Sequence, residues 1–315
     1  MTKIAGASSL QAGTLRRLAL GFGLSLHFLS ASLLPAAEAA IATRPLYVYN
    51  FGGLETLTAE QQCAAATDAG FAGLVLDVNN PTGMANLPRH LTYCTPPHHT
   101  KILAVFARID FANPAADTAR YQEVVKQIAG RDIPLWIILG NKKPDITRPE
   151  AEAALFAALE FAGKHGVRSA LYPHSNCFVS SAEGALPYVK KINRPDFTLL
   201  LNLCHEMRAG HGERLAEVVK ACAAHVSAII ISGADAKVDM TSPRTMDRST
   251  LQSLDRGAFD WASLVRLADT AGIRAPVAFI NFKINQNFGE DYRNYLPRSL
   301  AAWRKATATT ASTAK

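Results

Sequence analysis

Eight short apolar runs recur along this chain, and segments with helical character separate and follow them. The runs are rich in Val, Ile, Leu and Phe and mostly lack apolar–polar alternation, which is typical of buried parallel strands. Eight such units in one domain predict an α/β protein with a (β/α)₈ TIM barrel, and a doubly wound open sheet is the alternative. The predicted strands are Leu46–Asn50, Gly73–Asn79, Ile102–Asp110, Leu135–Gly140, Ser169–His174, Thr198–Leu203, Ala228–Ser232 and Val277–Phe282.

The segments between these strands carry the start and stop patterns of helices. Residues 58–61 (Thr-Ala-Glu-Gln) and 180–183 (Ser-Ser-Ala-Glu) both match the capping-box pattern. Pro149 suits the first turn of a helix, whereas Pro88 is expected to interrupt the segment Met84–Cys94. The other predicted helices are Ala115–Ile128, Glu150–Lys164, Glu213–His225, Trp261–Ala271 and Tyr292–Lys305.

The turn after the first strand argues against the open sheet and against a nucleotide cofactor. Residues 50–54 read Asn-Phe-Gly-Gly-Leu, without the G-x-G-x-x-G pattern that cradles a pyrophosphate. No Walker-type phosphate loop occurs elsewhere in the sequence. The sequence therefore favours the closed barrel.

The N-terminus resembles an export signal. Arg16 and Arg17 precede an apolar run, and the small-residue stretch that follows contains an A-x-A site at Ala37–Ala39. We expect a signal peptide over 1–39, a barrel over 40–305 and a disordered tail over 306–315. The mature protein is then periplasmic or secreted, without stable membrane insertion after cleavage; an uncleaved anchor helix is the alternative, and the export route stays open.

Charge and cysteine content bear on possible partners. Loss of the signal removes three cations (Lys3, Arg16, Arg17) and Glu38, which lowers the formal charge from +7 to +5. The remaining cations are scattered, so no nucleic-acid partner is predicted. The five cysteines are an odd number without a C-x-x-C pair, which indicates neither a disulfide framework nor a zinc knuckle.

Polar side chains gather where the predicted strands end. Side chains two positions apart on a strand point the same way, so pairs such as Tyr172 and His174 are expected to face one mouth of the barrel. His174, His205 and Glu206 are the candidate catalytic residues, because imidazole and carboxylate groups can move a proton. Each could instead be a cap, a turn residue or a solvated side chain. The candidate substrate-binding residues are Asn50, Asp77, Arg108, Tyr172, Asn202, Asp235, Arg256, Asn281 and Lys283.

Several short motifs give the chain a resemblance to a known family. The chain resembles the xylose isomerase-like TIM barrels of the sugar phosphate isomerase/epimerase group from about Leu46 to the C-terminal helix. The motifs that carry the resemblance are YPH at 172–174, NLCH at 202–205, SGAD at 232–235, LDRGAFD at 254–260 and RSLAAW at 298–303.

The resemblance implies a divalent metal, but the residues that usually bind it are replaced. Members of this superfamily hold the metal with carboxylates after strands five, six and eight and a His near strand seven. The matching positions here are Tyr172, Asn202, Asn281 and the neighbourhood of Ser232. Neutral Tyr and Asn side chains supply no negative charge for a hard cation, and Asn cannot act as a general base. The metal and the cofactor are therefore left open.

Two classes of function follow from the resemblance. The first is an exported sugar or keto-sugar isomerase or epimerase, with a lyase as a variant, that transfers a proton next to a carbonyl. The second is a sugar-binding TIM barrel that has lost the metal site and its chemistry. The retained His174 and His205 favour an enzyme, and Arg256 resembles the family's substrate-binding Arg after strand seven. Both classes imply a small sugar or sugar derivative as the partner.

Overall fold

Eight parallel strands close into a barrel in chain order, within a computed structural model that describes residues 44–94, 100–140 and 147–308. The first strand, β1 (Leu46–Tyr49), pairs with both β2 (Gly73–Asp77) and β8 (Val277–Phe279), which closes the sheet. The predicted (β/α)₈ barrel is therefore confirmed. The other strands are β3 (Lys101–Ile109), β4 (Leu135–Leu139), β5 (Ser169–Leu171), β6 (Phe197–Asn202) and β7 (Val226–Ile231).

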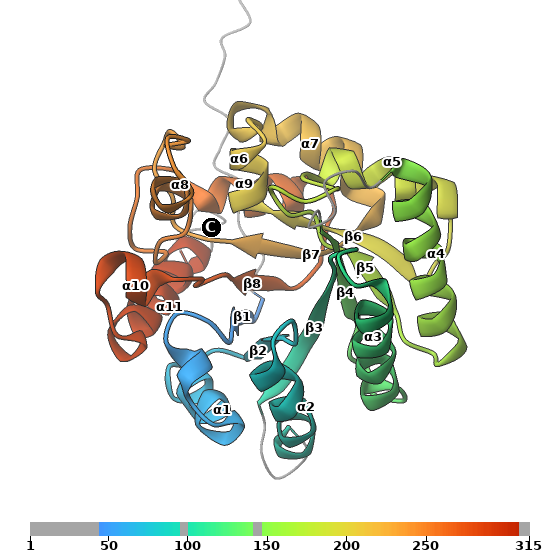
Figure 1. Cartoon of the computed structure of the whole chain (residues 1–315). Helices are drawn as coiled ribbons and strands as arrows, with labels where there is room; N and C mark the ends of the chain where they lie inside the picture. The colour runs from blue at the N-terminus through green and yellow to red at the C-terminus, as the bar shows by residue number, and fades with distance from the viewer. Residues whose placement is uncertain (1–43, 95–99, 141–146, 309–315) are drawn as a thin grey trace, which may run out of the picture. The chain divides into compact units, whose positions relative to one another are not determined.

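Helices surround the strands and connect each to the next, as Figure 1 shows. Short 3₁₀ turns at Leu54–Thr56, Gly212–Arg214 and Ala223–His225 supplement them. The helices are α1 (Ala59–Asp68), α2 (Pro81–Tyr93), α3 (Pro114–Ile128), α4 (Arg148–Lys164), α5 (Ala182–Ile192), α6 (Leu203–Arg208), α7 (Leu215–Cys222), α8 (Pro243–Thr250), α9 (Trp261–Thr270), α10 (Ile284–Phe288) and α11 (Tyr292–Ala308).

Both faces of each strand are buried, which explains the continuous apolar runs of the sequence. In β4, Leu135, Ile137 and Leu139 belong to the layer between strands and helices, whereas Trp136 and Ile138 fill the barrel interior. Alternation along a strand therefore sorts apolar side chains into two cores rather than into a core and a surface. The same alternation fixes which side chains reach the mouth of the barrel.

The sequence predicted one capping box correctly, whereas three other helix features differ from the prediction. The capping box at Thr58 is confirmed, since its hydroxyl accepts from Gln61 N and the Gln61 side chain accepts from Thr58 N. The cap of α5 is Ser181, not Ser180, and it accepts from Gly184 N without a capping box. Helix α2 runs through Pro88 because Leu87 and Leu91 bury its inner face, and this packing outweighs one missing hydrogen bond. Helix α11 extends past the predicted end of the barrel to Ala308.

The predicted signal peptide over 1–39 lies outside the described residues, as do positions 309–315 of the predicted tail. Among the helices that the structure describes, none combines the length and the apolar character needed to cross a membrane.

Candidate active site at the carboxyl ends of the strands

Two histidines stack against each other at the ends of neighbouring strands. His174 follows β5 and is half-buried, whereas His205 lies in the first turn of α6 after β6 and is fully buried. Their ring centroids are 4.3 Å apart, so the sequence correctly placed both at one mouth. We call His174 and His205 the histidine pair.

Hydrogen bonds define the tautomers of the histidine pair. The backbone N–H of Ser175 donates to Nδ1 of His205 over 3.1 Å, so this nitrogen carries no proton and Nε2 carries it. The buried Nε2 of His205 has no hydrogen-bond partner among the described residues. His174 Nδ1 lies 2.7 Å from the carbonyl oxygen of Ser175 and must donate to it, which leaves Nε2 of His174 as an acceptor. Arg108 Nη2 approaches this acceptor to 3.5 Å.

Burial and neighbouring cations keep both imidazoles neutral. Burial, followed by the charges of Arg108 and Arg208, lowers the pKa of His174 from 6.5 to about 4. Burial also holds the pKa of His205 well below its usual range, and His174, Arg208 and Arg108 add to the effect. At neutral pH the pair therefore offers one N–H donor and one nitrogen acceptor instead of a fixed positive charge.

Aromatic side chains form a floor beneath the mouth, which we call the aromatic floor. Phe51 and Phe282 meet at 5.1 Å between ring centroids, and Phe106 meets Tyr172 at 5.7 Å. Tyr172 in turn lies 6.0 Å from the ring of His205, so the floor extends to the histidine pair. Apolar surface edged by a few polar groups is typical of small-molecule sites. The floor consists of Tyr49, Phe51, Phe106, Trp136, Tyr172 and Phe282.

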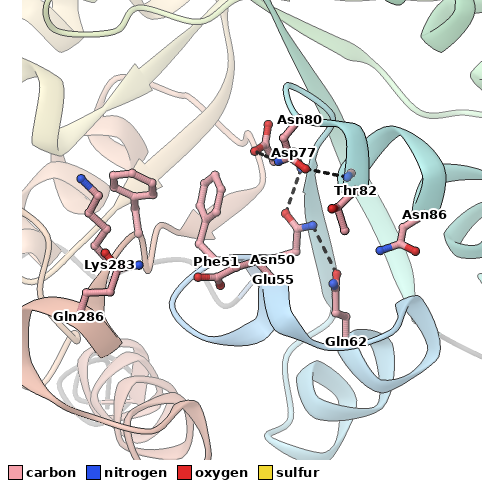
Figure 2. A pocket seen from close by; sticks show the side chains of 12 residues that line it. Asn50, Phe51, Glu55, Gln62, Asp77, Asn80, Thr82, Asn86, Lys283 and Gln286 are labelled. Carbon is pink, nitrogen blue, oxygen red and sulfur yellow. Dashed lines mark hydrogen bonds between the residues drawn. The ribbon is translucent and has the colours of Figure 1, made fainter.

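A cavity of about 230 Å³ opens at the ends of β1, β2 and β8, and we call it the rim cavity. Figure 2 shows Asn50, Gln62 and Asp77 on one side of it and Lys283 and Gln286 on the other. Asn50 bridges the first group, because its Oδ1 accepts from Asp77 N at 2.9 Å and its Nδ2 donates to Gln62 Oε1 at 3.3 Å. The residues that line the cavity are Asn50, Phe51, Glu55, Gln62, Asp77, Asn80, Thr82, Gly83, Asn86, Phe282, Lys283 and Gln286.

A buried ion-pair network connects the two regions, and sequence reasoning missed most of it. Asp247 of α8 accepts from Arg208 Nη2 at 3.0 Å and from Lys283 Nζ at 3.3 Å. Arg208 also donates to Ser175 Oγ at 3.4 Å, beside Nδ1 of His205. Arg208 stands three residues after His205 on one helix, and that spacing could have indicated a shared face. No local pattern indicates Asp247, because it lies on α8, a separate helix after β7.

Glu206 and Asn281 are placed away from the open mouth. The carboxylate of Glu206 accepts from Ala182 N at the start of α5 and pairs with His211 Nδ1, both at 2.7 Å. Asn281 stands two positions after Phe279 of β8, so its side chain points the same way, towards the surrounding helices. Its Nδ2 donates to the hydroxyl of Tyr295 on α11. Both residues are fully buried. Their predicted roles in catalysis and binding stay predictions, and the contacts that they make are structural.

The remaining predicted residues divide between the mouth and its outer loops. Asn202 Nδ2 donates to the hydroxyl of Tyr172 at 3.1 Å, inside the barrel next to the histidine pair. Asp235 is exposed and accepts from Gln252 Nε2 at 2.9 Å. Arg256 is exposed and pairs with Glu290 at 2.9 Å. The structure therefore brings Asp235 and Arg256 into contact with outer-loop residues.

The residues at the family's metal positions do not fit a divalent cation. Burial raises the pKa of Tyr172, so its hydroxyl stays protonated. Asn202 Oδ1 accepts from the thiol of Cys204, and the hydroxyl of Ser232 donates to Thr250 O. Within the described ranges, no three His, Cys, Asp or Glu side chains are arranged to hold a metal ion. The nearby Arg108 adds positive charge, which opposes cation binding.

A family description matches most of the barrel. The model of the xylose isomerase-like TIM barrel family matches residues 64–298. The chain belongs to the xylose isomerase-like TIM barrel family. The closed barrel of the structure agrees with that description. No curated protein matches the chain.

Solved structures share the barrel at low sequence identity. IolI, solved with a bound zinc atom, is 15% identical with a TM-score of 0.64, over 85% of this chain and 100% of its own. D-allulose 3-epimerase from Methylomonas sp., solved with D-allulose, is 15% identical with a TM-score of 0.59, over 86% and 100%. A probable 3-DHS dehydratase from Bacillus anthracis is 13% identical with a TM-score of 0.65, over 82% and 98%. At these identities the likeness establishes the fold alone.

Proposed function

We propose that this protein is an isomerase or epimerase that moves a proton next to the carbonyl of a sugar or keto-sugar, without a divalent metal. The observation that carries the proposal is the histidine pair, held neutral at the mouth with one donor and one acceptor nitrogen. The structural neighbours include sugar epimerases and a dehydratase, which supports a sugar-type substrate.

The two imidazoles divide the work of proton transfer. His174 is the less buried of the two, and its Nε2 can take the proton from the carbon beside the carbonyl. The electron pair of the broken C–H bond then moves onto the carbonyl oxygen. Arg108, 3.5 Å from His174, can stabilise that developing negative charge. His205 positions His174 from behind, and its unpartnered N–H can donate to a ligand oxygen or a water.

Proton return determines the product. Return to the opposite face of the same carbon gives an epimer. Return to the former carbonyl carbon gives an isomer, provided that the hydroxyl on the first carbon passes its proton to the former carbonyl oxygen. Loss of a leaving group from the same intermediate would make the protein a lyase, because the first step is shared. The rim cavity supplies amide and carboxylate groups that can hydrogen-bond sugar hydroxyls.

The second candidate is a sugar-binding barrel without catalysis, and the replaced carboxylates favour it. A panel of aldoses, ketoses and keto-sugars, with products followed by NMR and binding by calorimetry, separates the candidates. Turnover of any panel member supports the enzyme. Saturable binding of a sugar without turnover supports the binding protein and overturns the enzyme.

We further propose that the protein is exported and cleaved near Ala39. The Arg pair at 16–17, the apolar run and the A-x-A site support this proposal. Mass spectrometry of the N-terminus of protein from the native host should find a chain that begins near Ala40. Soluble protein that retains Met1 in the cytoplasm would contradict it.

A further inference from the structure

Two side chains from different elements hold the backbone of Arg108. Arg108 stands two positions after Phe106 of β3, so its side chain points into the mouth of the barrel. The backbone N–H of Arg108 donates to Oδ1 of Asn79, which follows β2. The carbonyl oxygen of Arg108 accepts from Nη2 of Arg120 on α3. Both hydrogen-bonding groups of this one residue are therefore fixed from outside its own strand.

A carboxylate orients each of the two side chains. Oδ1 of Asp77 accepts from the backbone N–H of Asn79 at 2.9 Å and from its Nδ2 at 2.6 Å. Because the amide nitrogen of Asn79 faces this oxygen, the amide oxygen is left to face Arg108. On the other side, Oδ1 of Asp117 accepts from Nη2 of Arg120 at 2.9 Å. Each bond to Arg108 therefore comes from a side chain that is itself held in place.

The turn that follows β3 is held as firmly as its end. Oδ2 of Asp117 accepts from the backbone N–H groups of Asp110 at 2.8 Å and of Phe111 at 3.0 Å. Phe111 is buried with a φ of 63°, a left-handed conformation that a bulky side chain rarely adopts. Such a conformation persists only where its surroundings enforce it, and it often marks a functional site. Helix α3 thus fixes the backbone over positions 108–111.

We propose that Asn79 and Arg120 are positioning residues that hold the guanidinium of Arg108 against His174. The guanidinium of Arg108 lies 3.5 Å from Nε2 of His174, and Asn79 and Arg120 act on it through backbone hydrogen bonds. A misplacement of about 1 Å at a reacting centre can cost on the order of 10²-fold in rate. The inference rests on the proposed proton transfer, in which Arg108 stabilises the developing negative charge.

Crystal structures of two variants test the positioning without any need for turnover. Asn79→Ala removes the bond to the N–H of Arg108, and Arg120→Met removes the bond to its carbonyl oxygen. In each variant the separation of Arg108 from His174 should grow from 3.5 Å by about 1 Å. Arg89→Met is the matched control, because it breaks an ion pair with Glu60 between α2 and α1 and should leave the separation unchanged. An unchanged separation in either test variant would overturn the inference for that residue.

Kinetics then separate positioning from a general loss of structure. On the sugar that the panel identifies, Asn79→Ala and Arg120→Met should each lower kcat by about 10–100-fold, with a smaller change in KM. In an Arg108→Met background neither change should lower kcat further, because residues that act as one unit are not additive. Equal losses with and without Arg108 would contradict the inference. Absence of turnover in the unaltered protein would defeat the proposed reaction, and the crystallographic separation would still decide the positioning.

Discussion

The histidine pair and the rim cavity lie at the same mouth but differ in what surrounds them. At the histidine pair, polar groups are packed, oriented by Ser175 and shifted in pKa by burial and cations. At the rim cavity there is open volume, and several amide side chains surround it. The first region presents one N–H donor and one acceptor nitrogen, as the proposed proton transfer requires, and the second has the space and hydrogen-bonding groups to hold a polar ligand.

This difference shows how the mouth of the barrel can position imidazoles without charged metal ligands. A divalent cation would need negative charge at the strand ends, which Tyr172 and Asn202 do not supply. The imidazoles need only burial and correct tautomers, and the loop after β5 supplies both through Ser175. Substitutions in the two regions should therefore change different kinetic constants.

Loss of His174 should have the largest effect. His174→Ala removes the acceptor nitrogen, so kcat should fall by about 10²–10⁴-fold while the fold persists. Steady-state kinetics on the sugar identified by the panel, together with circular dichroism, measure the two properties. His165→Ala is the matched control, because that ring caps α4 and stacks on Phe161. Unchanged kcat in His174→Ala would break the assignment of chemistry to the histidine pair.

Changes in the rim cavity should affect binding more than chemistry. Asn86→Leu replaces a cavity-lining amide by an apolar side chain of similar size, so KM should rise by about 10-fold with kcat little changed. Asn294→Leu makes the same exchange on α11, outside the cavity lining, and should leave KM unchanged. A fall in kcat without a change in KM for Asn86→Leu would remove the distinction between the two regions.

Acid should destabilise the protein through its buried imidazoles. Burial lowers the pKa of His90 to about 4, as for His174, whereas an unfolded His binds its proton near 6.5. Between these values the unfolded chain holds more protons, so the stabilisation is complete above about pH 6.5 and is lost as pH falls towards 4.

The free energy of unfolding should fall by about 1 kcal/mol per pH unit for each fully buried imidazole. Denaturant unfolding at pH 7 and at pH 5 measures this free energy. His90 faces Gln62, Glu60 and Arg89, and His90→Gln should reduce the pH dependence. The same pH dependence in wild type and His90→Gln would contradict the account of His90.

Metal removal should have the smallest effect. Because Tyr172, Asn202 and Ser232 supply no negative charge and no three metal-binding side chains come together among the described residues, dialysis against a chelator should change kcat by less than about two-fold. Activity before and after dialysis, with metal content by mass spectrometry, gives the result. If dialysis abolishes activity and a stoichiometric divalent metal restores it, the mouth holds a catalytic metal and the prediction is wrong.

The barrel could be predicted because its pattern is local and repeated. Each buried strand is a continuous apolar run, and eight of them leave few alternatives. The sequence predicted an interruption of α2 at Pro88, because a proline is visible in the local sequence. The packing of Leu87 and Leu91, which lets the helix continue, depends on the rest of the fold. Ser181 rather than Ser180 caps α5 for a similar reason: two adjacent serines offer the same sequence pattern, and the fold selects one.

Two things made part of the site predictable: which residues follow the strand ends, and the alternation of side chains along a strand. His174 and His205 were predicted because they follow strand ends. The side chain of Asn281 instead points out of the barrel and donates to Tyr295. Asp247 reaches Arg208 from α8, whose packing against α6 no sequence periodicity predicts.

Deuterium exchange tests the central claim most directly. Metal-depleted protein is incubated with the bound sugar in D₂O, and NMR follows the C–H bond beside the carbonyl. The account predicts deuterium at that carbon with the unaltered protein and its loss in His174→Ala, while both proteins still bind the sugar. Saturating binding to the unaltered protein without any exchange would contradict the account and identify the barrel as a binding protein.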